Sequence, residues 1–162
     1  MEKKKPKYIS EDDALIKLQW FCVYQDRCHK EVRNKLIELG IYGEALERII
    51  VALIQENFLN EERFAQSYAR GKFRMKRWGR YRIKRELKFR NISAYCIKKA
   101  MQEIDEDEYM ATLYALLEKK NATEREPNFY KRRNKLATYL INKGYESHLV
   151  WAAIKEVIVQ KK

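Results

Sequence analysis

Apolar residues recur at helical spacing along most of the chain, and the residues between them are mostly Lys, Glu, Arg and Ala, which favour helix. Three such stretches follow one another near residues 11–24, 28–39 and 44–56. Ser10, followed by three acids, is a typical helix start. Strands joined by hairpins would need more turn residues than five glycines and two prolines supply. The pattern predicts an all-α chain.

The helical pattern returns three times at a spacing of about 50 residues. Gly40, Asn91 and Gly144 lie 51 and 53 residues apart, and apolar residues surround them at matching offsets. These are Leu36, Leu87 and Leu140 four residues before, Val32, Ile83 and Leu136 eight before, Leu46, Ile97 and Val150 six after, Ile50, Met101 and Ile154 ten after, and Leu53, Ile104 and Val157 thirteen after. Because Gly and Asn tolerate left-handed backbone, each repeat is predicted to hold a helix, a left-handed stop and a second helix.

A further helical stretch precedes each of these pairs, near residues 60–76 in the second repeat and 106–119 in the third. The link that follows in the third repeat ends at Pro127, which suits the first turn of the next helix. We therefore expect three tandem three-helix repeats in an elongated, curved array, because one unit of about 50 residues buries little surface alone. The expected boundaries are a basic flexible tail at 1–10 and repeats at 11–57, 58–105 and 106–162.

Basic residues concentrate in the second repeat. Between residues 70 and 90, eleven of 21 residues are Lys or Arg and only Glu86 is acidic, which accounts for most of the net charge of +12. Two rows at helical spacing are expected to form one face: Arg70, Arg74 and Arg77, then Arg80, Lys84 and Lys88. Such a face attracts phosphate or acidic protein, and the interleaved aromatic rings could stack on bases or fill a core. Lys119, Lys120 and Lys155 of the third repeat are expected to matter less.

Motifs for catalysis, cofactors and metals are missing from the sequence. It contains no glycine-rich phosphate loop, no HExxH and no CxxC pair, so we expect no enzyme, no cofactor and no metal. Three cysteines fit reduced thiols in the cytoplasm, and no apolar run reaches the roughly 18 residues of a membrane span. Cys28, beside Arg27, could have a lowered pKa, although capping a helix is the simpler interpretation.

Three stretches resemble the RecX family, the bacterial regulators of the RecA recombinase. Residues 27–36 read RCHKEVRNKL and precede Gly40, similar to R-S-x-x-E-L-x-x-K-L…G. Residues 58–65 read FLNEERFA, similar to [YF]-[IL]-D-D-x-R-F-A, and residues 79–92 are similar to G-x-x-[RK]-I-x-x-E-L-x-x-[KR]-G-[IV]. The motif positions are Glu31, Leu36, Gly40, Arg63, Phe64, Ala65, Tyr68, Gly79, Ile83, Glu86, Leu87 and Asn91, with Gly144 as the equivalent stop in the third repeat.

Departures from the family pattern are conservative in their physical role. Cys28 stands where Ser is usual, Asn60 and Glu61 replace paired Asp, and Asn91 replaces Gly. Each substitute keeps the function of its position, as a small cap, a polar cap followed by an acid, and a residue that tolerates left-handed backbone.

The resemblance implies a regulator without catalytic activity that binds along the groove of the RecA filament on single-stranded DNA. In that family, binding limits filament growth, ATP hydrolysis, strand exchange and coprotease action in DNA repair and the SOS response. We expect a cytoplasmic monomer. Two alternatives stay open: a sequence-independent nucleic-acid-binding protein without a recombinase partner, and a helix-turn-helix transcription factor built on residues 87–104.

Overall fold

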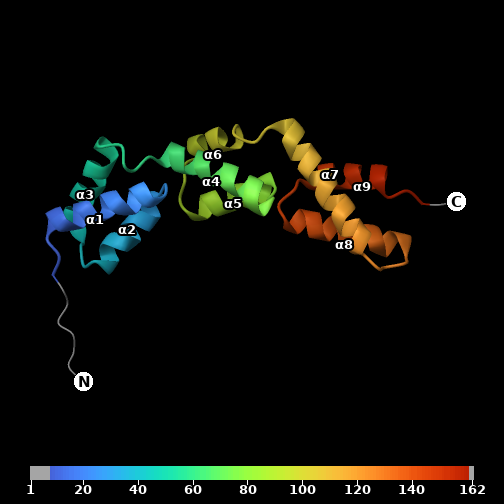
Figure 1. Ribbon diagram of the computed structural model, residues 1–162, viewed down its shortest axis with the longest axis horizontal. Coiled ribbons are helices and arrows are strands. Elements are labelled where there is room, and N and C mark those ends of the chain that lie inside the picture. Colours follow the sequence, from blue (N-terminus) through green and yellow to red (C-terminus); the bar gives the residue numbers. More distant parts are fainter. Residues whose placement is uncertain (1–7, 161–162) are drawn as a thin grey trace, which may run out of the picture.

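Residues 8–160 are described by a computed structural model, and within them nine α-helices follow one another without a strand. They are α1 (Glu11–Tyr24), α2 (His29–Glu38), α3 (Gly43–Gln55), α4 (Glu61–Lys76), α5 (Arg80–Phe89), α6 (Ala94–Met101), α7 (Glu106–Thr123), α8 (Phe129–Asn142) and α9 (Ser147–Val157). The helices form an elongated, curved row in three groups of three, with α1–α3 at one end and α7–α9 at the other (Figure 1). The predicted architecture is confirmed.

The predicted repeat boundaries and the tail stand differently. The boundaries at 11–57, 58–105 and 106–162 stay predictions, although the helices group as those ranges require. The expected basic tail falls largely on residues 1–7, which lie outside the described residues. We call α1–α3, α4–α6 and α7–α9 units one, two and three.

All three predicted stop residues have left-handed backbone, with φ of +86° at Gly40, +58° at Asn91 and +105° at Gly144. In each case the next residue donates its backbone N–H to a carbonyl five positions earlier. These bonds run from Ile41 to Leu36 at 2.9 Å, from Ile92 to Leu87 at 3.1 Å and from Tyr145 to Leu140 at 3.3 Å. All six side chains are buried. Each unit therefore uses the same Schellman ending, and the prediction is confirmed.

The apolar side chains form two cores of unequal extent. One core belongs to unit one, whereas the other runs without interruption through units two and three, from Leu87 to Leu140. Cys28 of unit one is fully buried against this second core. Units two and three are thus joined by shared apolar packing, while unit one keeps a core of its own.

Some local predictions need correction. The helix expected at 106–119 continues to Thr123. Pro127 lies before that segment's next helix, because Asn128 is the N-cap and its side chain accepts the N–H of Lys131 at 3.0 Å. The link between the two helices is held by Arg132, which donates to three backbone carbonyls along it. Among the aligned repeat positions, Met101 and Val157 are only partly buried.

The three cysteines are buried and free. Burial raises the pKa of the Cys28 thiol, which donates to the Glu31 carboxylate at 3.3 Å, so a lowered pKa at this position is wrong. Within residues 8–160 no group of three His, Cys, Asp or Glu side chains is arranged to hold a metal ion. No helix in that range is long and apolar enough to cross a bilayer.

Candidate anion-binding interface

Helix α4 carries the first predicted row of cations. Asn60 starts the helix by accepting the N–H of Arg63 at 2.9 Å, and fully buried Ala65 and Ala69 allow α6 to pack closely on one side. Arg70 in this row is already paired, since its guanidinium lies 3.1 Å from the Glu103 carboxylate. The other two members of the row, at positions 74 and 77, are exposed.

Arg80, at the start of the second row, is a structural residue of the junction between units two and three. Its guanidinium donates to Glu146 at 2.8 Å, also pairs with Glu106, and lies 3.9 Å from the centre of the Tyr109 ring. Glu146 is 7% exposed and is the one buried charged side chain among residues 8–160. Arg80 therefore compensates a buried charge, which costs several kcal/mol when left unpaired.

The buried Tyr109 completes this junction. Its hydroxyl donates to Glu146 and accepts the backbone N–H of Arg80, the latter at 3.1 Å. Burial and then the bond to Glu146 raise the pKa of Tyr109 far above its ordinary value, so the phenol stays protonated. The ring also packs against Tyr145, with centroids 5.0 Å apart.

Free cations do lie on the outward side of α5. Lys88 and Arg85 are exposed and Lys84 is half-buried, and none of the three has a carboxylate within 4 Å in the described part of the chain. Tyr81 and Phe89 flank them, 58% and 69% exposed. Of the six predicted contact residues, Arg70 and Arg80 are thus engaged in ion pairs, and the remaining four are available.

A second set of cations is held against aromatic rings. Arg82 lies 4.2 Å from the centre of the Trp78 ring, and Lys72 lies 5.0 Å from the same ring. Arg90 lies 4.9 Å from the Tyr68 ring and pairs with Glu86 at 3.2 Å. These rings are partly buried against the core. They stabilise the basic helices from below, whereas Tyr81 and Phe89 are the rings left open to a partner.

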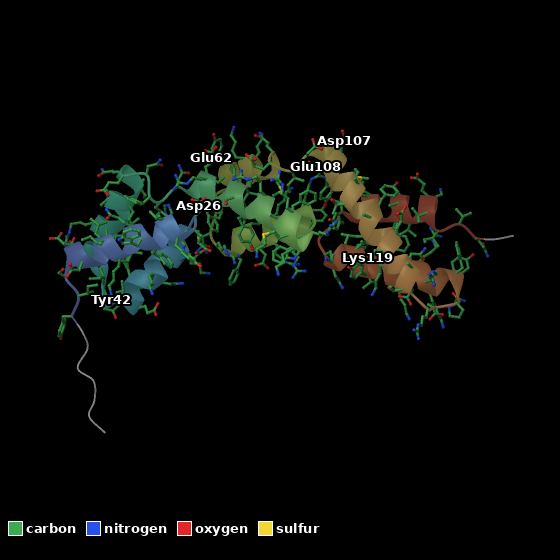
Figure 2. All side chains as sticks on the ribbon, in the orientation of Figure 1. Asp26, Tyr42, Glu62, Asp107, Glu108 and Lys119 are labelled. Atoms are coloured by element: carbon green, nitrogen blue, oxygen red, sulfur yellow. The ribbon has the colours of Figure 1, made fainter. Side chains whose placement is uncertain are left out.

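The other motif residues hold the units together. Arg63 donates to Asp26 of unit one at 2.8 Å and to the backbone carbonyls of Asn57 and Phe58 in the link. Figure 2 shows Asp26 at this junction, next to the start of α4. Phe64 is buried, as are the other apolar motif residues except Tyr68, which packs at the edge of the core.

Gly79 and Gly144 bring the backbones of units two and three into direct contact. The N–H of Gly79 donates to the carbonyl of Lys143 at 2.8 Å, and the N–H of Tyr81 donates to that of Gly144 at 2.9 Å. A Cβ on Gly79 would lie 2.2 Å from the carbonyl carbon of Gly144. Only glycine allows this approach, which explains the glycine that opens the third motif.

The comparisons with known proteins follow the three-unit layout. Residues 60–101 match the family model described as RecX, second three-helix domain, and residues 106–154 match RecX, third three-helix domain. The chain belongs to the RecX family. The resemblance of the motifs is thereby confirmed for the chain as a whole, including its third unit, which carries none of the three motif stretches.

Relatives of this RecX-family chain include the regulatory protein RecX of Clostridium tetani, 30% identical over 96% of this chain and 72% of that protein. The regulatory protein RecX of Clostridium perfringens is 32% identical over 74% of this chain and 57% of its own length. The crystal structure of RecX from Lactobacillus salivarius has the same fold, with a TM-score of 0.78 and 23% identity over 91% of this chain and 96% of that one. The chain is thus a RecX-like regulator.

Proposed function

We propose that this chain binds a RecA-type recombinase filament on single-stranded DNA and inhibits its ATP hydrolysis, strand exchange and coprotease action without catalysing a reaction itself. Membership of a family of regulatory proteins supports the regulatory part of the proposal. The observation that carries the contact is the outward side of α5, where Lys84, Arg85 and Lys88 have no carboxylate partner among residues 8–160.

The distribution of charge supports an oriented contact. Residues 58–105 contain fourteen Lys or Arg and five acids, whereas residues 11–57 contain six and nine. A filament of protein on DNA offers phosphates and acidic side chains side by side, and an elongated curved row can lie along it. We therefore propose that unit two faces the filament, through Arg74, Arg77, Lys84 and Lys88.

The test is the single-stranded-DNA-dependent ATPase of the recombinase from the same organism. The double variant Lys84→Glu, Lys88→Glu should raise the concentration for half-inhibition by about tenfold or more, because each surface contact contributes on the order of 1 kcal/mol. The control, Lys17→Glu with Lys155→Glu, makes the same change in net charge at exposed positions of α1 and α9 and should inhibit like the wild type. A folded double variant that inhibits as well as the wild type contradicts the proposal.

Arg80 is left out of this test for a structural reason. Its reversal would place a third carboxylate beside Glu106 and Glu146, so lost inhibition could reflect lost folding. Lys84 and Lys88 have no such partner, and substitutions at exposed positions of this kind change stability by about 0.5 kcal/mol or less.

A second candidate is sequence-independent binding of single-stranded nucleic acid with no recombinase partner. The exposed rings of Tyr81 and Phe89 beside free cations favour it, since ring stacking and phosphate contacts together are the usual basis of such binding. It predicts tight binding to bare DNA that falls about 10³-fold between low and moderate salt.

A further inference from the structure

A pocket of about 290 Å³ lies between units two and three, where the end of α4 meets α7 and α8. Five cations line it: Lys76, Arg77, Lys119, Lys120 and Lys143. No carboxylate is among its lining residues. Lys119 lies on the part of α7 that passes α8 (Figure 2). The fold thus gathers, at one point, cations from three helices that are 43 and 67 residues apart when counted from Lys76.

The five cations keep their charge available. Within the described residues none of them has an Asp or Glu oxygen within 4 Å, in contrast to Arg70 and Arg80 nearby. A cluster of five like charges without a counterion is unfavourable by itself. An anion in the pocket would remove that cost.

Other contacts fix the ammonium groups without neutralising them. The ammonium of Lys143 donates to the backbone carbonyl of Lys76 at 3.3 Å, at the negative end of the α4 dipole. Lys120 and Lys143 lie 5.0 and 5.9 Å from the centre of the Tyr139 ring. Carbonyl and ring oppose the repulsion between the cations, and both leave further N–H donors free.

The electrostatics of Lys143 show the same strain. Burial lowers the pKa of its ammonium, and the cations at Arg82, Arg77 and Lys119 lower it further. An anion bound among these groups favours the charged form and would raise this pKa again. Binding would therefore be strongest where the lysines are protonated, which includes neutral pH.

We propose that this pocket binds a phosphate group. A phosphate offers several acceptor oxygens to ammonium and guanidinium donors, which form short, strong, charge-assisted hydrogen bonds with it. The volume lies at the lower end of the range for small-molecule sites, so it suits a phosphate rather than a whole cofactor. The source is a backbone phosphate of single-stranded DNA or a free phosphate ion, and the experiment separates the two.

For a backbone phosphate, this inference deepens the proposed function and rests on it for the presence of DNA. Arg77, which lines the pocket, belongs to the same basic row as Arg74, and α5 begins three residues later. A strand seated in the pocket could therefore continue along unit two. The phosphate contact would then join unit three to an interface that the sequence indicated for unit two alone.

The test compares wild type with Lys119→Gln, Lys120→Gln and with Lys119→Gln, Lys143→Gln. Binding of a labelled oligothymidine is measured by fluorescence anisotropy over a salt series, without recombinase. Each lost phosphate contact reduces the slope of log affinity against log salt by about 0.7 for single strands, so each double variant should lose about 0.7–1.4. The control, Lys17→Gln with Lys155→Gln, should keep the wild-type slope.

A second arm titrates inorganic pyrophosphate and follows it by calorimetry. Loss of the oligothymidine contact in the variants supports a backbone phosphate, and loss of pyrophosphate binding alone supports a free ion. Unchanged slope and unchanged pyrophosphate binding in both folded double variants would overturn the proposal. Because Lys119 and Lys120 make no contact that Gln would break apart from the Tyr139 ring, the first variant is expected to fold.

The two proposals fail separately. The ATPase assay with Lys84→Glu, Lys88→Glu leaves the pocket intact, and the pocket variants leave the outward side of α5 intact. A changed salt slope with unimpaired regulation of the recombinase would keep the pocket and refute the proposed function, and the opposite result would refute the pocket.

Discussion

Gly79→Ala is a sharp test of how units two and three are joined. The added Cβ would lie 2.2 Å from the carbonyl carbon of Gly144 and 2.3 Å from the N of Tyr145. Both are backbone atoms that cannot move aside by changing a rotamer. The φ of Gly79 is −77°, which alanine adopts without strain. The substitution therefore acts on the contact between the units and leaves the local backbone preference nearly unaffected.

The expected loss of stability follows from the contacts around this point. Separating the backbones breaks the hydrogen bonds from Gly79 to Lys143 and from Tyr81 to Gly144, at about 0.5–1.5 kcal/mol each. It also loosens the pair between Arg80 and the buried Glu146, and losing such a pair outright costs about 3–5 kcal/mol. Partial rehydration offsets some of this, so we expect a net loss of about 3 kcal/mol.

The assay is urea and thermal unfolding followed by circular dichroism, with Gly71→Ala as the matched control. Gly71 lies inside α4, and a Cβ at this position would meet no atom within 4 Å, so alanine should stabilise by about 0.5–1 kcal/mol. A loss of about 3 kcal/mol corresponds to a fall in Tm of roughly 6–12 °C for a chain of this size. If Gly79→Ala unfolds at the wild-type midpoint, the close backbone contact does not hold the two units together.

Three further outcomes are expected. The buried thiols of Cys22, Cys28 and Cys96 have raised pKa values, so Ellman's reagent should react with them slowly in the folded chain and rapidly in urea; fast reaction of the folded chain would contradict their burial. Arg63→Ala should speed amide hydrogen exchange in the link between units one and two without affecting unit three; equal exchange would deny Arg63 its joining role. Asn91→Ala should destabilise by about 1 kcal/mol in urea unfolding, and Asn91→Gly should not, because φ is +58° there.

Much of the fold could be predicted because its determinants are local. A left-handed stop at Gly40, Asn91 and Gly144 depends on residue type, and the leucines four residues earlier are fully buried as their spacing indicates. The helix starts at Ser10 and Asn60 follow from the same short-range chemistry, and both side chains accept the predicted N–H groups.

The candidate site was less predictable because it depends on partners far away in the chain. Arg80 has the spacing of an exposed row, but its partner Glu146 lies 66 residues later. The lysines at 119 and 120 gave no sign of belonging with Lys76, since only the packing of α7 against the end of α4 brings them together. A helical pattern tells which side of a helix is polar, and it does not tell which polar residues meet a carboxylate.

The central claim is that the chain recognises the recombinase filament itself. The most direct measurement is the affinity of the fluorescently labelled chain for filaments assembled on single-stranded DNA by its own recombinase with a slowly hydrolysed ATP analogue, beside its affinity for the same DNA without protein, both at about 0.15 M salt. We predict binding to the filament at least about tenfold tighter than to bare DNA, and loss of most of that preference in Lys84→Glu, Lys88→Glu. Equal affinity for the filament and for bare DNA would contradict the claim.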